Sequence, residues 1–193
     1  MFNHSWKKEL FTIPNFLSLF RLLLIPTYVY LYLNATQPSD YYLAGTILGI
    51  SCLTDFADGK IARDFHMVSE VGKLLDPLAD KLTQFTLLIT LSQKYQVLYP
   101  VLFLFLVKET FQCVCLLLFI QKGKVLPGAL LVGKICTAAL FVSLIILVLF
   151  PNISRITLQL IVTVDSFLII NSFFGYTMAY FGKNPKLTDL HYE

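Results

Sequence analysis

The sequence predicts an all-α integral membrane protein, built as a bundle of six transmembrane helices. Of its 193 residues, 56% are hydrophobic and 14% are charged, and the mean hydropathy is +0.71. A soluble domain is less apolar and carries more charge than this. Six apolar stretches also approach the roughly 20 residues that an α-helix needs to cross a bilayer. Together these observations exclude a soluble globular protein.

The six predicted spans follow one another with short connections, so we expect one membrane domain that covers residues 1–193. The first span contains Arg21 and has no small-residue cleavage pattern after it, which favours an anchor over a removable signal peptide. Residues 1–11 mix Trp6 with Lys7 and Lys8, and they predict either a short interfacial helix or a simple positive flank. The spans are residues 15–34, 41–61, 74–92, 98–121, 131–150 and 156–181.

Lysine and arginine are distributed unevenly along this pattern. Short loops rich in these residues stay in the cytoplasm, and a cytoplasmic N terminus places most of them on the inner side. Among the lysines and arginines near the connections, Lys94 and Arg155 would lie on the outer side of the membrane. We therefore expect both termini in the cytoplasm, and the net charge of +3 suits an anionic leaflet better than nucleic acid. The inner residues are Lys7, Lys8, Lys60, Arg63, Lys73, Lys122, Lys124, Lys134, Lys183 and Lys186.

Four aspartates at the predicted cytoplasmic ends of the second and third spans form the main candidate site. Asp55 and Asp58 are three residues apart, Asp76 and Asp80 are four apart, and each pair shares a helix face. Four negative charges at the edge of a bilayer need compensation, which two divalent cations would supply. Oxygen ligands select a hard ion such as Mg²⁺ or Mn²⁺, and paired metals typically serve phosphoryl displacement. The aspartates therefore indicate phosphate chemistry.

Small residues and an arginine accompany the aspartates. Gly59 and Ala62 follow Asp58 at helical spacing and would expose a strip of backbone on which a flat ligand could lie, and Gly72 would thin the next helix. Taken alone, the glycines are better explained by close helix packing. Arg63 can grip phosphate oxygens with two parallel hydrogen bonds, and its alternative role is a positive flank at the inner face.

Eight of these residues resemble the complete signature of the CDP-alcohol phosphatidyltransferase family. They form the pattern Asp55-x2-Asp58-Gly59-x2-Ala62-Arg63-x8-Gly72-x3-Asp76-x3-Asp80. Other segments resemble the family as well, namely Ile13-Pro14-Asn15 with Ser18 and Arg21, and Gly133-Lys134 with Thr137. The resemblance implies a six-helix membrane enzyme, commonly dimeric, that transfers a phosphatidyl group from CDP-diacylglycerol to an alcohol and releases CMP.

The resemblance also implies a role for each signature position. Asp55, Asp58 and Asp76 would be metal ligands, with Asp80 at the second metal and acting as the base that accepts the proton of the attacking hydroxyl. Two divalent cations, Mg²⁺ or Mn²⁺, would be the cofactors, and membrane lipids would surround the tails of CDP-diacylglycerol. The predicted CDP-binding set is Asp55, Asp58, Gly59, Ala62, Arg63 and Gly72.

The sequence specifies the acceptor alcohol less closely than it specifies the reaction class. The sequence is similar to phosphatidylglycerophosphate synthases, which use glycerol 3-phosphate, and to cardiolipin synthases of the same family, which use phosphatidylglycerol. Glycerol 3-phosphate is the first choice, although Val107-Lys108-Glu109 stands where the first group usually has Ala-Arg-Glu. Arg21 could instead belong to an interhelical hydrogen-bond set. The predicted acceptor-binding residues are Lys73, Lys81, Lys108, Glu109, Lys134, Thr137 and Arg21.

A divalent-cation transporter or cation-binding membrane protein is the alternative from another class. It would also place carboxylates near a bundle axis, but it needs polar groups along a path through both leaflets. Here the acidic residues gather at the inner boundary. Asp165 in the last span is an exception, and it either pairs with a basic residue or lines the outer half of a cavity.

Overall fold

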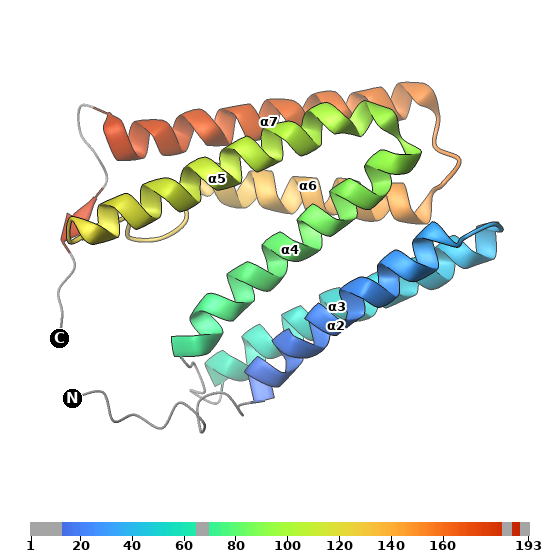
Figure 1. The fold of residues 1–193 in the computed structure, drawn as a ribbon, viewed down its shortest axis with the longest axis horizontal. Coiled ribbons are helices and arrows are strands. Elements are labelled where there is room, and N and C mark those ends of the chain that lie inside the picture. Colours follow the sequence, from blue (N-terminus) through green and yellow to red (C-terminus); the bar gives the residue numbers. More distant parts are fainter. Residues whose placement is uncertain (1–12, 65–69, 183–186, 190–193) are drawn as a thin grey trace. The chain divides into compact units, whose positions relative to one another are not determined.

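The computed structural model describes residues 13–64, 70–182 and 187–189, and the side chains of 13–16, 18, 55–64, 70–77 and 189 are not described. The described chain is almost entirely helical (Figure 1). The predicted interfacial segment, residues 1–11, lies outside the described residues. The α-helices are α2 (Ile13–Leu33), α3 (Pro38–Asp64), α4 (Glu70–Lys94), α5 (Tyr99–Gln121), α6 (Leu131–Leu149) and α7 (Arg155–Phe181). A 3₁₀ turn, η1 (Gln96–Leu98), precedes α5.

The connection from α2 to α3 is closed by local hydrogen bonds. At the end of α2 the side-chain amide of Asn34 donates to the Tyr30 carbonyl at 2.8 Å. Pro38 opens α3, where its missing N–H costs nothing. The Asp40 carboxylate accepts from the backbone amides of Thr36 and Gln37, each at 2.9 Å. These bonds satisfy donors that a helix N terminus otherwise leaves open.

The boundaries of α5 and α7 follow from a glycine and a serine. Gly123 follows α5 with φ +70°, a left-handed conformation that ends helices and that glycine adopts at little cost. Ser154 caps α7, and its hydroxyl accepts from the Thr157 backbone amide at 3.1 Å. A Ser or Thr at this position is a common helix start.

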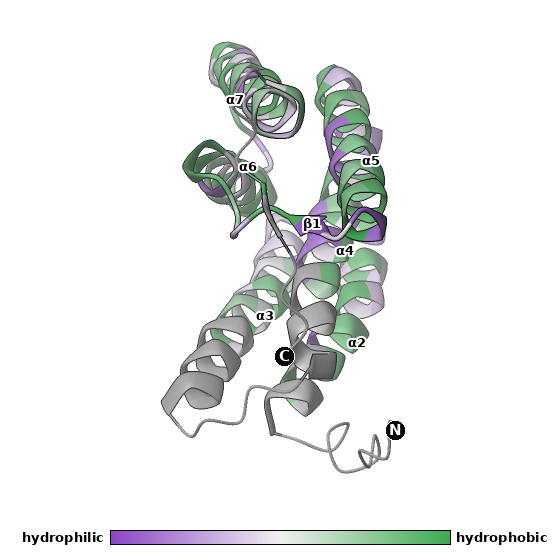
Figure 2. Cartoon of the chain, turned by 90° about the vertical axis from the view of Figure 1, so that its left-hand side faces the viewer, coloured by the Kyte–Doolittle hydropathy of each residue, from purple (hydrophilic) through white to green (hydrophobic). Residues whose placement is uncertain are grey.

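The surface and interior have the polarity of a membrane protein. Three described helical segments, Gln96–Gln121, Leu131–Leu149 and Arg155–Phe181, are long and apolar enough to cross a bilayer, and Leu19–Leu33 is a shorter apolar helix. Large apolar side chains such as Leu23, Phe167 and Met178 are exposed on helix faces. Figure 2 shows hydrophobic colouring over most of α5, α6 and α7. Such faces suit contact with lipid acyl chains, so the chain is a helical membrane protein.

The described chain divides into two compact units. The first holds α2, α3, α4 to residue 91, and residues Ile145–Pro151 at the end of α6. Within it α2 packs along α3 (Figure 1). Gly45 of α3 lies against Leu149, because a Cβ at Gly45 would come within 2.5 Å of the Leu149 Cδ2 atom. A small residue at this position therefore lets α3 and the end of α6 approach closely.

The second unit holds η1, α5, α6 to residue 144, and α7. Phe111 of α5 packs on Phe173 of α7 with ring centroids 4.7 Å apart, and Phe119 stacks on Tyr180 at 5.1 Å. Because both residue numbers rise together, α5 and α7 run parallel. Two-residue strands β1 (Lys124–Val125) and β2 (Thr188–Asp189) pair in antiparallel fashion, which the all-α prediction did not include.

Candidate active site

The four aspartates of the predicted site lie at neighbouring ends of two helices in the first unit. Asp55 and Asp58 are in the last three turns of α3, and Asp76 and Asp80 are in the first three turns of α4. Helical backbone at these positions confirms that each pair has the spacing of one helix face. Of the other signature residues, Gly59, Ala62 and Arg63 lie on α3 and Gly72 lies on α4. Lys73, a predicted acceptor-binding residue, follows Gly72 on α4.

Asp80 is the signature aspartate whose side chain the structure describes. Its Oδ1 atom accepts a hydrogen bond from Nη1 of Arg21 at 2.7 Å, and the two charges form a salt bridge. The Arg21 side chain is 3% exposed and the Asp80 side chain is 49% exposed. The contact joins α2 to α4 and has a buried cation and a carboxylate that faces outward. A charge-assisted hydrogen bond of this length is among the stronger ones in proteins.

This donor set suits a hard divalent cation. Its members are carboxylates at the ends of α3 and α4 in one compact unit, and Asp80 is open enough for a ligand to reach. Oxygen ligands of this kind hold Mg²⁺ or Mn²⁺. In the described part of the chain no three metal-binding side chains gather, but Asp55, Asp58 and Asp76 have no described side chains. The metal site therefore stays a prediction.

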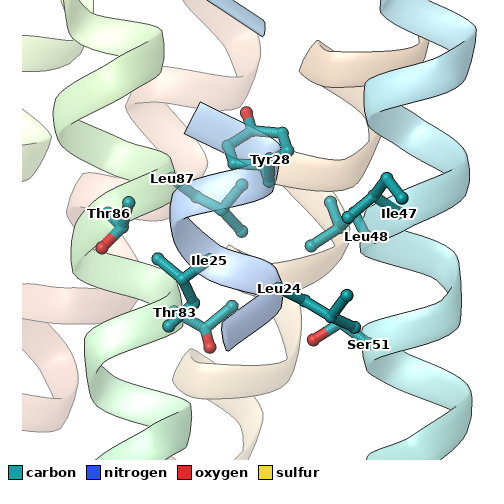
Figure 3. Close-up of a pocket in the computed structure, with 9 residues that line it drawn as sticks. All are labelled: Leu24, Ile25, Tyr28, Ile47, Leu48, Ser51, Thr83, Thr86 and Leu87. Carbon is teal, nitrogen blue, oxygen red and sulfur yellow. The ribbon is translucent and has the colours of Figure 1, made fainter. Parts of the chain in front are cut away.

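A small cavity lies one turn further along the same three helices (Figure 3). Leu24 and Thr83 line it, and each stands three residues beyond Arg21 or Asp80 on its helix. In Figure 3 the hydroxyl groups of Thr83 and Ser51 lie at one end of the cavity and that of Tyr28 at the other. The cavity measures about 10 Å³, close to the minimum for one water molecule, so it has no room for a substrate.

The predicted acceptor residues are divided between the two units. Arg21, Lys73 and Lys81 belong to the first unit, and Lys81 is partly buried one residue after Asp80. The others are in the second unit, where Lys108 Nζ contacts Glu109 Oε1 at 2.6 Å on α5. Lys108 is buried, and the carboxylate of Glu109, the next residue in the chain, compensates its positive charge. On α6, Lys134 is exposed and Thr137 is partly buried.

Asp165 has a partner that sequence reasoning did not identify. It is 2% exposed on α7, and its Oδ1 atom accepts a hydrogen bond from the Ser143 hydroxyl on α6 at 3.1 Å. The sequence left a basic partner or a cavity as the alternatives for this residue. A serine in a neighbouring apolar helix carries little signal by itself, because its depth in the bundle has to be known before the two can be paired.

Comparison with known proteins decides the family. The sequence profile of the CDP-alcohol phosphatidyltransferases matches residues 11–173, which include all eight signature positions. The chain belongs to the CDP-alcohol phosphatidyltransferase family. The resemblance seen in the sequence is therefore confirmed.

The relatives that are similar to this chain are named for two different activities. A CDP-diacylglycerol–glycerol-3-phosphate 3-phosphatidyltransferase of Aquifex aeolicus is 35% identical over 88% of this chain and 96% of its own length. A protein of the same name from Blochmanniella floridana is 37% identical over 45% of each chain. A CMP-forming cardiolipin synthase of Streptomyces coelicolor is 31% identical over 65% of this chain and 60% of its own length.

Proposed function

We propose that this phosphatidyltransferase moves a phosphatidyl group from CDP-diacylglycerol to glycerol 3-phosphate, giving phosphatidylglycerophosphate and CMP. The observation that carries the proposal is the match to the Aquifex aeolicus enzyme, because it runs over almost the full length of both chains. Family membership and the complete aspartate signature support the same reaction class. The half-exposed side chain of Asp80, in the third turn of α4, supports a role in contact with substrate.

In this proposal each signature residue acts on the diphosphate or the acceptor. Asp55, Asp58, Asp76 and Asp80 hold two Mg²⁺ or Mn²⁺ ions, which, when bound, neutralise the diphosphate and make CMP a better leaving group. The CDP group binds beside Asp55 and Asp58. The remaining members of that site are Gly59, Ala62, Arg63 and Gly72.

The chemical step is a single displacement at phosphorus. The acceptor hydroxyl oxygen bonds to the phosphorus that carries diacylglycerol, and the bond from that phosphorus to the CMP oxygen breaks. Asp80 takes the proton of the hydroxyl. A carboxylate is a weak base for an alcohol, but a late proton transfer reduces the mismatch.

The membrane arrangement is part of the proposal. We propose that the six helices α2 to α7 form the six predicted spans, and we place both termini and the aspartates on the cytoplasmic side, where CDP-diacylglycerol and glycerol 3-phosphate would meet. The acyl tails remain in the lipid around the helices. The family resemblance supports a homodimer.

Phosphatidylglycerol is the second candidate acceptor, which would make the chain a cardiolipin synthase. The Streptomyces coelicolor relative has that name, and Val107-Lys108-Glu109 on α5 differs from the pattern usual in glycerol 3-phosphate enzymes. Lys108 is buried and its charge is already compensated by Glu109, which weakens this pair as a site for a small dianion. The two acceptors separate the candidates directly.

The test is acceptor-dependent release of CMP by the purified full chain. CDP-diacylglycerol is supplied with Mg²⁺ or Mn²⁺, and glycerol 3-phosphate, phosphatidylglycerol or no acceptor is added. Asp80→Asn should lower release to a small residual rate. Asp165→Asn is the matched control, because it changes an aspartate outside the signature and should remain active. Release with phosphatidylglycerol alone would move the assignment to cardiolipin synthesis. No release with a wide panel of alcohols, by folded protein that binds metal, would favour the cation-transporter alternative.

A further inference from the structure

We propose that Arg21 is the positioning residue of Asp80 and does not bind the acceptor phosphate. The inference rests on the proposed function, in which Asp80 accepts the proton of the acceptor hydroxyl. It replaces the acceptor-binding role that the sequence suggested for Arg21. It agrees with the other sequence alternative, an interhelical hydrogen-bond set.

The first support is the difference in exposure between the two side chains. Arg21 is enclosed, with 3% of its side chain exposed, whereas 49% of the Asp80 side chain is exposed. A phosphate-binding arginine has to present its guanidinium to a ligand that arrives from outside. Here the guanidinium is directed to Oδ1 of Asp80, 2.7 Å away, and the outward-facing partner is the carboxylate.

The second support is that the two residues come from different helices. Arg21 lies on α2 and Asp80 on α4, 59 positions apart in the chain but in the same compact unit. A half-exposed aspartate on one helix can occupy several rotamers. A charge-assisted hydrogen bond from a second helix restricts that choice. Because a small misplacement of a reacting group is costly, this restriction acts directly on the rate.

The third support is the packing that holds Arg21 itself. Leu24 and Ile25, on the next turn of α2, line the small cavity together with Thr83 and Leu87 of α4 (Figure 3). The two helices therefore border the same small cavity immediately beyond the salt bridge. Because the cavity is small, adjoining turns of α2 and α4 lie close enough to help enclose the Arg21 side chain.

The experiment separates positioning from acceptor binding by steady-state kinetics. Arg21→Met and Arg21→Lys are compared with wild type in CMP release, with glycerol 3-phosphate or phosphatidylglycerol vesicles as the varied acceptor. We expect Arg21→Met to lower kcat about 10- to 100-fold, the usual effect of losing a residue that orients a metal ligand, with the acceptor KM unchanged. Arg21→Lys should recover part of kcat, because it keeps the charge and loses the planar fork.

A double variant gives a second readout. If Arg21 acts through Asp80, Arg21→Met should lower the residual activity of Asp80→Asn by far less than it lowers that of wild type. Tyr28→Phe is the matched control: it removes a buried polar atom from α2 whose hydroxyl has no hydrogen-bond partner in the described part of the chain. It should leave kcat unchanged.

Three kinetic outcomes would overturn the proposal. A rise in acceptor KM at unchanged kcat would return Arg21 to the acceptor site, and fully additive losses with Asp80→Asn would show that the two act separately. Unchanged kinetics would leave Arg21 no role in the step. If Arg21→Met does not fold, Arg21→Lys and Arg21→Gln provide the same comparison. A wild type that releases no CMP would instead overturn the proposed function, and this failure is visible before any variant is made.

Discussion

Tyr176 of α7 lies directly against Gly133 in the first turn of α6. A Cβ atom at Gly133 would stand 2.6 Å from the Tyr176 hydroxyl oxygen and 2.8 Å from its Cε2 atom. The same hydroxyl accepts a hydrogen bond from the Leu130 backbone amide at 3.3 Å. The glycine therefore allows the ring of Tyr176 to approach the backbone at the start of α6. This gives a physical reason for a glycine in the Gly133-Lys134 segment.

Gly133→Ala should destabilise the protein, because the Tyr176 ring cannot move without loss of its hydrogen bond and its packing. We expect a cost of about 1–3 kcal/mol, the usual range for overpacking. Gly49→Ala is the matched control on α3, since nothing lies within 4 Å of its added Cβ. There we expect a gain of about 0.5–1 kcal/mol from helix propensity. Thermal unfolding in detergent measures both, and equal effects of the two changes would contradict the close contact.

The Ser143–Asp165 hydrogen bond should contribute to the packing of α6 on α7. Asp165→Asn keeps an acceptor oxygen for the Ser143 hydroxyl, whereas Asp165→Ala removes it, so the alanine variant should unfold at the lower temperature. A double-mutant cycle with Ser143→Ala should give a coupling of about 0.6 kcal/mol, the average for hydrogen bonds between membrane helices. A coupling of zero would show that the bond contributes nothing to stability.

The sequence predicted the helices well and their contacts poorly. The predicted span 131–150 became α6, Leu131–Leu149, because a continuous apolar run specifies both type and length. The helix α3, Pro38–Asp64, extends beyond its predicted span 41–61, since proline and Asp40 start it before the apolar run and the aspartate-rich segment continues it. The sequence therefore predicted where these helices lie in the chain and which functional residues each one carries.

Contacts between helices depend on depth and rotation, which a single sequence does not fix. Ser143 could not be paired with Asp165, and Arg21 could not be assigned to Asp80 in preference to a ligand. The β1–β2 pairing was missed for a different reason. Strands of two residues have no alternation of polar and apolar side chains to identify them.

Asp40 should make the stability of the protein depend on pH at acidic values. Hydrogen bonds from the backbone amides of Gln37 and Thr36 hold the pKa of this carboxyl below its usual value of 3.8. Because the folded pKa is lower than the unfolded one, the ionised group stabilises the fold fully above the unfolded value. That contribution is lost as the pH falls through the lowered pKa. Asp40 precedes the predicted span that begins at residue 41.

Asp40→Asn checks this assignment. Both backbone N–H groups donate to the same Asp40 oxygen, and the asparagine amide oxygen can still accept them. It carries no charge, so the hydrogen bonds are weaker and the variant should unfold at a lower temperature than wild type at neutral pH. The difference between the two proteins should shrink as the pH is lowered below the ordinary carboxyl range. Melting temperatures measured at intervals from neutral to acidic pH follow it. A constant difference across that range would exclude the charge of Asp40 as the cause.

Divalent cations should stabilise the folded protein through the aspartates of α3 and α4. A ligand that binds the folded state alone adds about 2.7 kcal/mol at a concentration 100 times its dissociation constant, so Mg²⁺ or Mn²⁺ should raise the melting temperature and a chelator should reverse the effect. Asp58→Asn and Asp76→Asn remove predicted ligands from α3 and α4 and should each reduce the shift. Asp165→Asn lies outside the predicted metal site and should keep it. This measurement needs no substrate and is independent of the acceptor. If all three variants kept the full shift, the cations would be binding elsewhere, and the paired carboxylates would need another role in the transfer reaction.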